Sequence, residues 1–221
     1  MCDNIRECGN DAEKKAASVI SFYMICHKLK DVIRTGWINW NVKKERLESI
    51  AEHIYGVQML AIAMHSEFEY KDIDITKVIY MLAIHELGET IIGDLTQFQI
   101  SKEEKEKIEH EAVHKILGGL MNGEQIEEIF LEFDAHETKE AMFAYQCDKL
   151  ECDLQCKLYD QENGVDLTAQ EDNPIIKNKT VSELLQSGCS WSEMWLIHDQ
   201  KTYSYDKNFI SVSNYAMEND I

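Results

Sequence analysis

The chain has 221 residues, 44% of them hydrophobic, which is enough for one sizeable core and favours a single domain. Its 22 basic and 41 acidic residues give a net charge of −19, and such a surface would repel the phosphate backbone of a nucleic acid. No apolar run approaches a membrane span, no signal-peptide pattern opens the chain, and seven cysteines, an odd number, do not indicate a disulfide framework, so we expect a cytoplasmic protein without nucleic-acid or membrane partners.

Helices are predicted along the whole chain, because one proline and ten glycines leave few breaks and Glu, Lys, Gln and Ala are frequent between the apolar positions. Residues 1–10 are polar and are predicted to form a flexible leader. A first helix is expected over residues 11–33 and a second over residues 47–68, where His53 lies among apolar residues. The side chains of the first helix that should face the core include Val19, Ile20, Tyr23, Met24 and Leu29.

The stretch YMLAIHELGETIIGDLTQF, residues 80–98, places several ionisable side chains in an apolar setting. Its apolar residues recur at helical spacing, so most of it is predicted to be one buried helix, which begins after the cap Asp74. His85 and Glu89 are four residues apart and would share a face, with Glu86 about 100° around the same turn. Such groups are costly to bury unless they pair with one another or bind a metal, and this stretch alone leaves both alternatives open.

Further helices are predicted after this stretch, and some begin at a capping box, in which Ser or Thr precedes Glu by three residues. Asp148 lies in one of them, among Ala, Cys and Leu residues. The predicted helices cover residues 101–118, 124–133 and 137–159, and two short terminal helices follow capping boxes at Thr180 and Ser190. We expect a helical core over residues 11–160 and, over residues 161–221, a loop and C-terminal helices that pack on it.

The pattern HExxH, which is typical of zinc peptidases, occurs as HEAVH at residues 110–114. Two histidines one turn apart could bind zinc, and Glu111 could activate a water molecule. However, the preceding residues KEEKEKIE are strongly charged, so this helix is expected to be half-exposed, and no distinctive third-ligand pattern follows. A metallopeptidase is therefore the weaker alternative.

Four motifs follow one another along the chain: RTGW at residues 34–37, ESIAEH at 48–53, HELGETIIGDL at 85–95, and YQCDKLECDLQ around Asp148. In this order they resemble the HD superfamily of metal-dependent phosphohydrolases, and within it the branch of bacterial 5′-deoxynucleotidases and their eukaryotic HD-domain relatives. The resemblance spans residues 15–160. It implies an all-α, single-domain helical bundle of the HD type and a hydrolase that removes phosphate from nucleoside 5′-monophosphates, with deoxynucleosides as the expected substrates.

The resemblance also implies a metal site and catalytic residues. One divalent ion, such as Mn, Co, Fe or Zn, would be bound by two histidines and two carboxylates: His53, His85, Glu86 and Asp148. Glu89 and Asp94 match acidic residues of the family's catalytic motif, and they would position and deprotonate water or assist the leaving ribose oxygen.

Substrate contacts are implied for the segment between the first two helices. Arg34 would grip the phosphate, a task that guanidinium geometry suits, and Trp37 would pack against the sugar. Arg46 is a second phosphate candidate, and the alternative is an ion pair with Glu48 or Glu52. The family resemblance further suggests a homodimer.

The chain departs from the family at one ligand, because the His-Asp pair is His85-Glu86 here. Glutamate can still bind a metal, but its side chain is one methylene longer, which would change the metal preference, weaken affinity or abolish activity. A catalytically weakened protein that binds nucleotide or metal is therefore a second alternative. The retention of Glu89 and Asp94 argues against complete loss of function.

Overall fold

The regular elements of the chain are helices in the computed structural model, which describes residues 2–96 and 99–221, with side chains from residue 11 onward. Within these residues the β-type pairing is one isolated antiparallel bridge, between Ile33 and Ser49. The predicted all-α fold is confirmed. The flexible leader predicted for residues 1–10 stays a prediction, because Met1 and the side chains of residues 2–10 lie outside the described part of the structure.

The elements follow in chain order. The first half forms α1 (Cys2–His27), the 3-10 helix η1 (Lys28–Lys30), α2 (Thr35–Asn39), α3 (Ile50–Glu67), α4 (Ile75–Ile84) and α5 (Glu89–Ile92). The second half forms α6 (Lys102–Leu117), α7 (Gly123–Ala135), α8 (Lys139–Gln161), η2 (Leu167–Ala169), η3 (Pro174–Lys177), α9 (Lys179–Gln186), α10 (Trp191–Thr202) and α11 (Lys207–Glu218). Among the described residues, no helix combines the length and apolarity needed to cross a bilayer.

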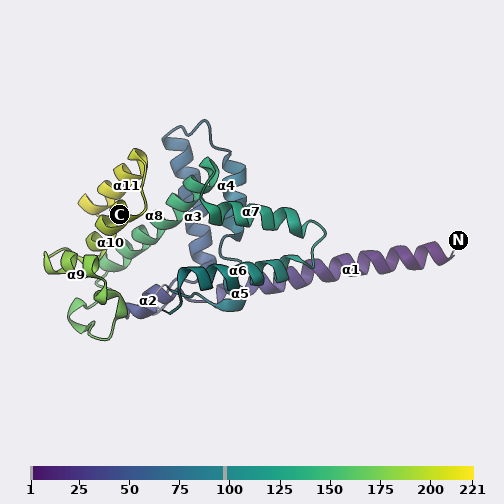
Figure 1. The fold of residues 1–221 in the computed structure, drawn as a ribbon, viewed down its shortest axis with the longest axis horizontal. Coiled ribbons are helices and arrows are strands. Elements are labelled where there is room, and N and C mark those ends of the chain that lie inside the picture. The colour runs from purple at the N-terminus through teal and green to yellow at the C-terminus, as the bar shows by residue number, and fades with distance from the viewer. Residues whose placement is uncertain (1, 97–98) are drawn as a thin grey trace.

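Helix α8 is central in the molecule: α3, α4 and α7 pack against it, and so do α10 and α11 near the C-terminus (Figure 1). Val57 of α3, Leu82 of α4 and Leu150 of α8 are fully buried in the main core. Burying each such side chain contributes about 1.5–3 kcal/mol. A second core cluster brings Trp37 of α2 against Trp191 of α10, so the C-terminal helices pack beside the segment that carries Arg34.

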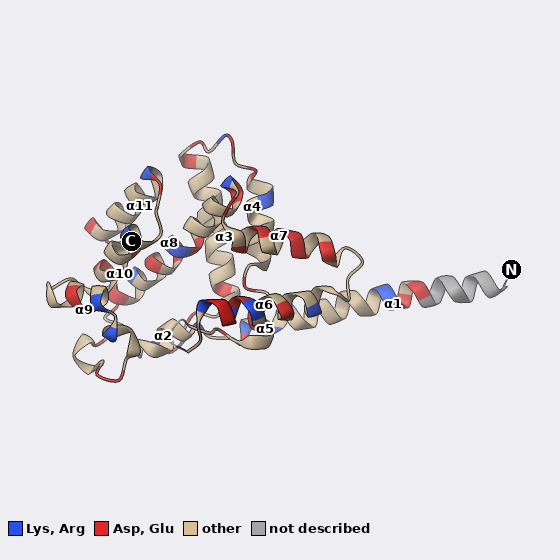
Figure 2. Cartoon of the chain, viewed as in Figure 1, with Lys and Arg blue, Asp and Glu red and all other residues tan. Residues whose placement is uncertain are grey.

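Helix α1 turns a different face to the core from the one predicted. The side chains of Val19, Ile20, Tyr23 and Met24 are 55–60% exposed, and of the predicted set only Leu29, in η1, is buried. The side chains of α1 that pack on a core cluster are instead Phe22, Ile25 and Cys26. Residues 16–26 carry no charge, so hydrophobic periodicity alone does not select one face (Figure 2).

The prediction that one helix covers most of residues 80–98 is wrong, because α4 ends at Ile84 and a turn precedes the short α5. Hydrogen bonds between residues three apart hold this turn, from Leu87 N–H to the Ile84 carbonyl at 2.9 Å and from Glu89 N–H to the Glu86 carbonyl at 3.1 Å. A continuous helix would point consecutive side chains about 100° apart. The turn instead brings His85 and Glu86 to one site. Phe98 lies outside the described residues.

Predicted helix starts are mostly confirmed. Asp74 caps α4, Ser101 caps α6, and Ser190 caps α10 with the full capping box. The start at Thr180 is wrong, because the side chain of Asn178 accepts from the backbone of Thr180 and Val181 and caps α9 instead. Asparagine satisfies the free N–H groups of a first helical turn as well as threonine does. Helix α11 is a further terminal helix that was not predicted.

Candidate metal centre

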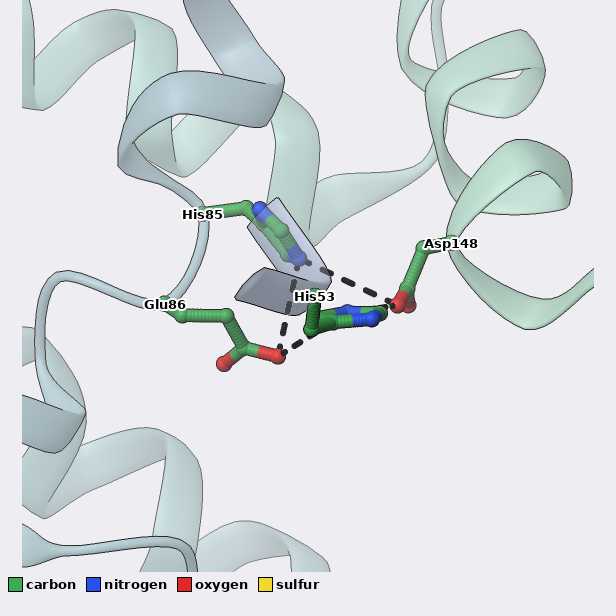
Figure 3. Close-up of side chains that lie close together, drawn as sticks. All are labelled: His53, His85, Glu86 and Asp148. Carbon is green, nitrogen blue, oxygen red and sulfur yellow. Dashed lines mark hydrogen bonds and ion pairs between the residues drawn. The ribbon is translucent and has the colours of Figure 1, made fainter. Parts of the chain in front are cut away.

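Four polar side chains from three parts of the chain converge in the core (Figure 3). His53 comes from α3, His85 and Glu86 from the turn after α4, and Asp148 from α8. One ligand atom from each lies within 4.8 Å of the others. Two imidazoles and two carboxylates are a donor set that suits first-row divalent ions.

His53 is fully buried and is held at both ring nitrogens. Its Nδ1 lies 2.6 Å from Glu151 Oε2, and its Nε2 lies 3.0 Å from Asp148 Oδ1. If Nδ1–H donates to Glu151, Nε2 keeps the lone pair that a metal needs. Gly56, on the next turn of α3, makes room for this contact, because a Cβ there would lie 2.3 Å from Glu151 Oε1.

His85 shows most directly that the cluster fits a metal ion. Its Nδ1–H donates to the Leu82 carbonyl at 2.8 Å, which fixes the ring and leaves Nε2 as the free nitrogen. This Nε2 is buried and has no hydrogen-bond partner among the described residues. It lies 3.5 Å from Glu86 Oε1 and 3.8 Å from Asp148 Oδ1. A buried ring nitrogen between two carboxylates is a ready ligand, so the residues present fit the ion that the sequence implies.

Glu86 reaches the cluster despite its extra methylene. Its Oε1 lies 3.5 Å from His85 Nε2 and 3.9 Å from His53 Nε2, and also 3.8 Å from the Nη1 atom of Arg34. The longer side chain therefore presents one oxygen to the two imidazoles and to the guanidinium at once. The departure from His-Asp does not remove the carboxylate from the site.

Charges within the cluster balance one another. Burial lowers the pKa of His53, but the hydrogen bonds to Asp148 and Glu151 outweigh this effect and raise its pKa to about 9. Burial raises the pKa of Asp148, yet Lys149 and the two histidines hold it well below the usual range. For Glu86, the nearby histidines and Arg34 also outweigh burial and lower the pKa. Opposite charges in a buried site therefore keep both carboxylates ionised.

The proposed phosphate and sugar residues lie beside a cavity of about 420 Å³ that also reaches Asp148. Arg34 lines it, and 16% of its side chain is exposed. Trp37 also lines the cavity; it is 4% exposed, and its indole N–H already donates to Glu48 Oε2 at 2.9 Å. Asp94 also lines the cavity, and its carboxylate accepts from the Thr35 backbone N–H.

Glu89 lies close to this cavity but is only 2% exposed. Lys105 Nζ donates to its Oε1 at 3.3 Å, whereas Oε2 has no partner among the described residues. Burial, together with the charges of Glu86 and Asp94, raises the pKa of Glu89 well above its usual range. Burial and the neighbouring negative charges therefore favour the protonated form of this carboxyl.

Arg46 lies apart from the cluster. It forms an ion pair with Glu52, its side chain is 79% exposed, and it borders a separate cavity near Glu151 and Tyr159. The ion-pair alternative that the sequence left open is the one seen in the structure.

The HExxH histidines do not converge on one point. His110 Nε2 contacts Asp134 at 2.8 Å, and His114 Nδ1 contacts Glu127 at 3.0 Å, so each pairs with a different carboxylate of α7. The side chain of His114 is 74% exposed. The geometry gives the metallopeptidase alternative no support.

Glu151 and Lys149 contact the cluster but were not singled out in the sequence. Glu151 follows Asp148 by three residues, so both side chains lie on the face of α8 that is turned toward His53. That spacing could have identified Glu151 from the sequence. Lys149 Nζ lies 2.8 Å from Asp148 Oδ2, which leaves Oδ1 toward the histidines. A lysine next to an aspartate carries no such signal in a chain this rich in charge.

Comparisons with known proteins agree with this geometry. The family model of the HD domain matches residues 26–187. The 5′-deoxynucleotidase HDDC2 of Dictyostelium discoideum is 34% identical over 66% of this chain and 80% of its own, and the 5′-deoxynucleotidase hdd1 of Schizosaccharomyces pombe is 32% identical over 68% and 77%. A solved structure from Magnetospirillum magnetotacticum, described as a predicted metal-dependent phosphohydrolase, shares the fold with a TM-score of 0.59, at 22% identity over 92% of this chain and 97% of its own. This chain belongs to the HD domain family.

Proposed function

We propose that the protein is a metal-dependent phosphomonoesterase that removes phosphate from nucleoside 5′-monophosphates, with deoxynucleosides preferred. The observation that carries the proposal is the cluster of His53, His85, Glu86 and Asp148 beside the cavity that Arg34 lines. Two relatives named as 5′-deoxynucleotidases support the choice of substrate. One Mn, Co, Fe or Zn ion, when bound, would offset phosphoryl charge and lower the pKa of a bound water.

Arg34 is assigned to the phosphate. Its guanidinium borders the cavity, and Glu48 and Glu86 hold it at 4.0 and 3.8 Å. A guanidinium presents two parallel N–H donors that match two phosphate oxygens. A phosphate bound there would lie between Arg34 and the four ligand side chains, with the sugar toward the face of Trp37.

Asp94 is assigned to proton transfer, because its carboxylate lines the cavity and is fixed by Thr35. It can accept a proton from the attacking water or assist the leaving ribose oxygen. Glu89 is more deeply buried, so we assign it a positioning role through its neighbours Glu86, Asp94 and Lys105. Asp94 thus keeps the catalytic role expected from the sequence, whereas the role proposed for Glu89 changes from catalytic to positioning.

The second alternative, a weakened protein that binds without turnover, depends on Glu86. The variant Glu86→Asp separates the two, with turnover and metal content as the measurements. A site adapted to glutamate should lose about tenfold in turnover, because a shorter carboxylate draws back from His85 and His53. A large rise in turnover would favour loss of an ancestral activity instead.

The first experiment is metal analysis of the purified protein, followed by phosphate release from a panel of deoxy- and ribonucleoside 5′-monophosphates. We expect bound divalent metal and turnover that a chelator removes and added Mn or Co restores. Bound metal without phosphate release from any member of the panel would contradict the proposal. His114→Ala is the matched control and should change neither result.

We also propose a homodimer, built on the exposed apolar face of α1. Val19, Ile20, Tyr23 and Met24 lie on a helix that projects from the body of the molecule (Figure 1). Exposed apolar patches of this kind mark interaction sites. Light scattering should show twice the chain mass, and Ile20→Glu with Met24→Glu should yield monomers. The cytoplasmic location expected from the sequence stays a prediction.

A further inference from the structure

The cavity beside the metal centre extends beyond the residues assigned to metal and phosphate. Its volume of about 420 Å³ lies within the range of about 300–1,000 Å³ that is usual for small-molecule sites. Besides Arg34 and Asp148, its lining includes residues of α10 and its C-terminal cap, namely Trp195, Asp199 and Tyr203. The family model ends at residue 187, so these residues lie in a part of the chain that the family match does not cover.

Helix α8 sets the direction and length of the cavity. Asp148, Cys152, Asp153 and Cys156 all line it, so it follows α8 for about two turns, away from the metal ligands. At 1.5 Å per residue, Asp153 lies about 7.5 Å farther along the helix axis than Asp148. In a nucleoside 5′-monophosphate the sugar separates phosphate from base. With the phosphate at Arg34, the base therefore points along α8 toward α10.

Aromatic rings enclose this farther part of the cavity. The rings of Trp40 and Trp195 are 6.1 Å apart and nearly perpendicular, and Tyr203 joins them in the lining. Aromatic side chains are the usual stacking surfaces for nucleobases. The indole N–H of Trp40 is buried without an acceptor among the described residues, so a polar ligand group would complete its hydrogen bonding.

Two carboxyl groups supply the polar part of the same wall. Asp153 is 2% exposed and accepts from the Tyr205 hydroxyl at 3.4 Å; Asp199 is 6% exposed and contacts His198 Nδ1 at 2.6 Å. Both line the cavity. Carboxyl oxygens accept hydrogen bonds from amino groups such as N4 of cytosine, whereas O4 of uracil is itself an acceptor and would be repelled. A phosphate would also be repelled here, which keeps the nucleotide in one orientation.

We infer that the α10 end of the cavity is a base subsite that selects nucleobases carrying an amino group in the position of N4 of cytosine or N6 of adenine over uracil and thymine. The inference rests on the proposed function, because the phosphate position orients the nucleotide. Asp199 and Asp153 are the specificity-determining residues, and Trp195 supplies the stacking surface.

The test compares dCMP with dUMP, which share the sugar and phosphate and differ at position 4 of the base. With metal-loaded protein, kcat/KM for dCMP should exceed that for dUMP by about tenfold or more, and Asp199→Asn should reduce this ratio by about tenfold. Turnover of deoxyribose 5-phosphate, which has no base, should not change. Asp166→Asn changes an exposed cap carboxyl that is not part of the cavity lining, so it is the matched control and should keep the dCMP preference.

A second variant tests the stacking surface. Trp195→Ala should raise KM for both nucleotides about tenfold without changing their ratio or the turnover of deoxyribose 5-phosphate. Equal use of dCMP and dUMP by the wild type, or an unchanged ratio in Asp199→Asn, would overturn the base subsite while leaving the phosphatase intact. If no phosphate ester is hydrolysed, the proposed function fails. The subsite is then tested by calorimetric dissociation constants for dCMP and dUMP, and equal values would overturn it as well.

Discussion

Two regions of this molecule contain a pair of histidines next to a glutamate, and they differ in the burial of the histidines and in the carboxylates that these contact. His53 and His85 come from α3 and from the turn after α4, and their side chains are 0% and 2% exposed. His110 and His114 lie one turn apart on α6, with side chains 39% and 74% exposed. The first pair faces two shared carboxylates, whereas each histidine of the second pair contacts a separate carboxylate on α7.

The comparison shows that spacing within one helix is weaker information than convergence between helices. The sequence HEAVH matches a zinc pattern. Its histidines are exposed to water, however, so they would gain little free energy by binding a metal. The other site removes four polar groups from water, and the free Nε2 of His85 leaves one of them unsatisfied. A buried acceptor without a partner costs about 1–3 kcal/mol, so the buried cluster favours an added ion.

The largest effect should come from the ligand on α8. Asp148→Ala should abolish metal binding and lower phosphate release by at least about 100-fold, because the variant loses the carboxylate that faces both histidines. Metal analysis and circular dichroism check the result, since the helical content should be retained. His114→Ala is the matched change in the other pair, and full metal content is expected there. Retained metal and turnover in Asp148→Ala would refute the site.

A smaller loss is expected at Glu151, which orients His53 without facing the other three ligands. Glu151→Ala should weaken metal affinity about 10–100-fold, because Nδ1 of His53 loses its acceptor and the ring its fixed orientation. Gly56→Ala should act in the same direction, since the added methyl collides with Glu151. Competition calorimetry on chelator-stripped protein measures both.

Gly119 provides the control for that experiment, because a Cβ there meets no heavy atom within 4 Å. Gly119→Ala should leave the dissociation constant unchanged, and Glu151→Gln should recover most of the affinity, because a glutamine carbonyl can still accept from Nδ1. Equal affinity in Glu151→Ala and wild type would show that the contact does not orient the ligand.

Arg34 and Arg46 show the same contrast between a buried and an exposed side chain. Arg34→Ala should raise KM for nucleotides about tenfold or more with metal content intact, because a charge-assisted contact to phosphate is lost. Arg46→Ala should leave KM within about twofold, since an exposed ion pair with Glu52 contributes little. Steady-state kinetics on both variants decides between them. Loss of metal from Arg34→Ala would contradict the phosphate role.

The sequence predicted the features that local chemistry controls. The caps Asp74, Ser101 and Ser190 were correct because a side-chain oxygen near free N–H groups is a local signal. The four proposed metal ligands were found by family resemblance, and the structure brings their side chains together. Taken alone in an apolar helix, each ligand would have been interpreted as a buried polar residue that pairs with a neighbouring side chain.

The features that were not predicted from the sequence depend on tertiary contacts. The buried face of α1 depends on where α6 and η1 pack, and Val19 and Phe22 are equally apolar as sequence. The turn at His85 interrupts a run of residues whose periodicity predicts one helix. This turn places the consecutive side chains of His85 and Glu86 in the same cluster. Asp199 is far from every motif, and only the packing of α10 on α8 brings it to the cavity.

The smallest effect concerns Asp153, at the end of the cavity away from the metal ligands. Burial and the neighbouring Asp199 raise the pKa of Asp153 well above its usual range, so this carboxyl binds its proton more tightly in the folded protein than in the unfolded chain, where it titrates near pH 4. Stability from this group is complete below that pH and falls as pH rises, by up to about 1.4 kcal/mol per pH unit.

Asp153→Asn keeps the shape without the titration, so the free energy of unfolding of the variant should rise relative to that of the wild type as the pH is raised from 5 to 8. Urea unfolding of chelator-treated proteins at both pH values gives the difference. Asp166→Asn is the opposite case, because Thr168 lowers the pKa of Asp166, and its stability relative to wild type should not rise with pH. A constant difference between Asp153→Asn and wild type would mean that the fold does not raise the pKa of Asp153.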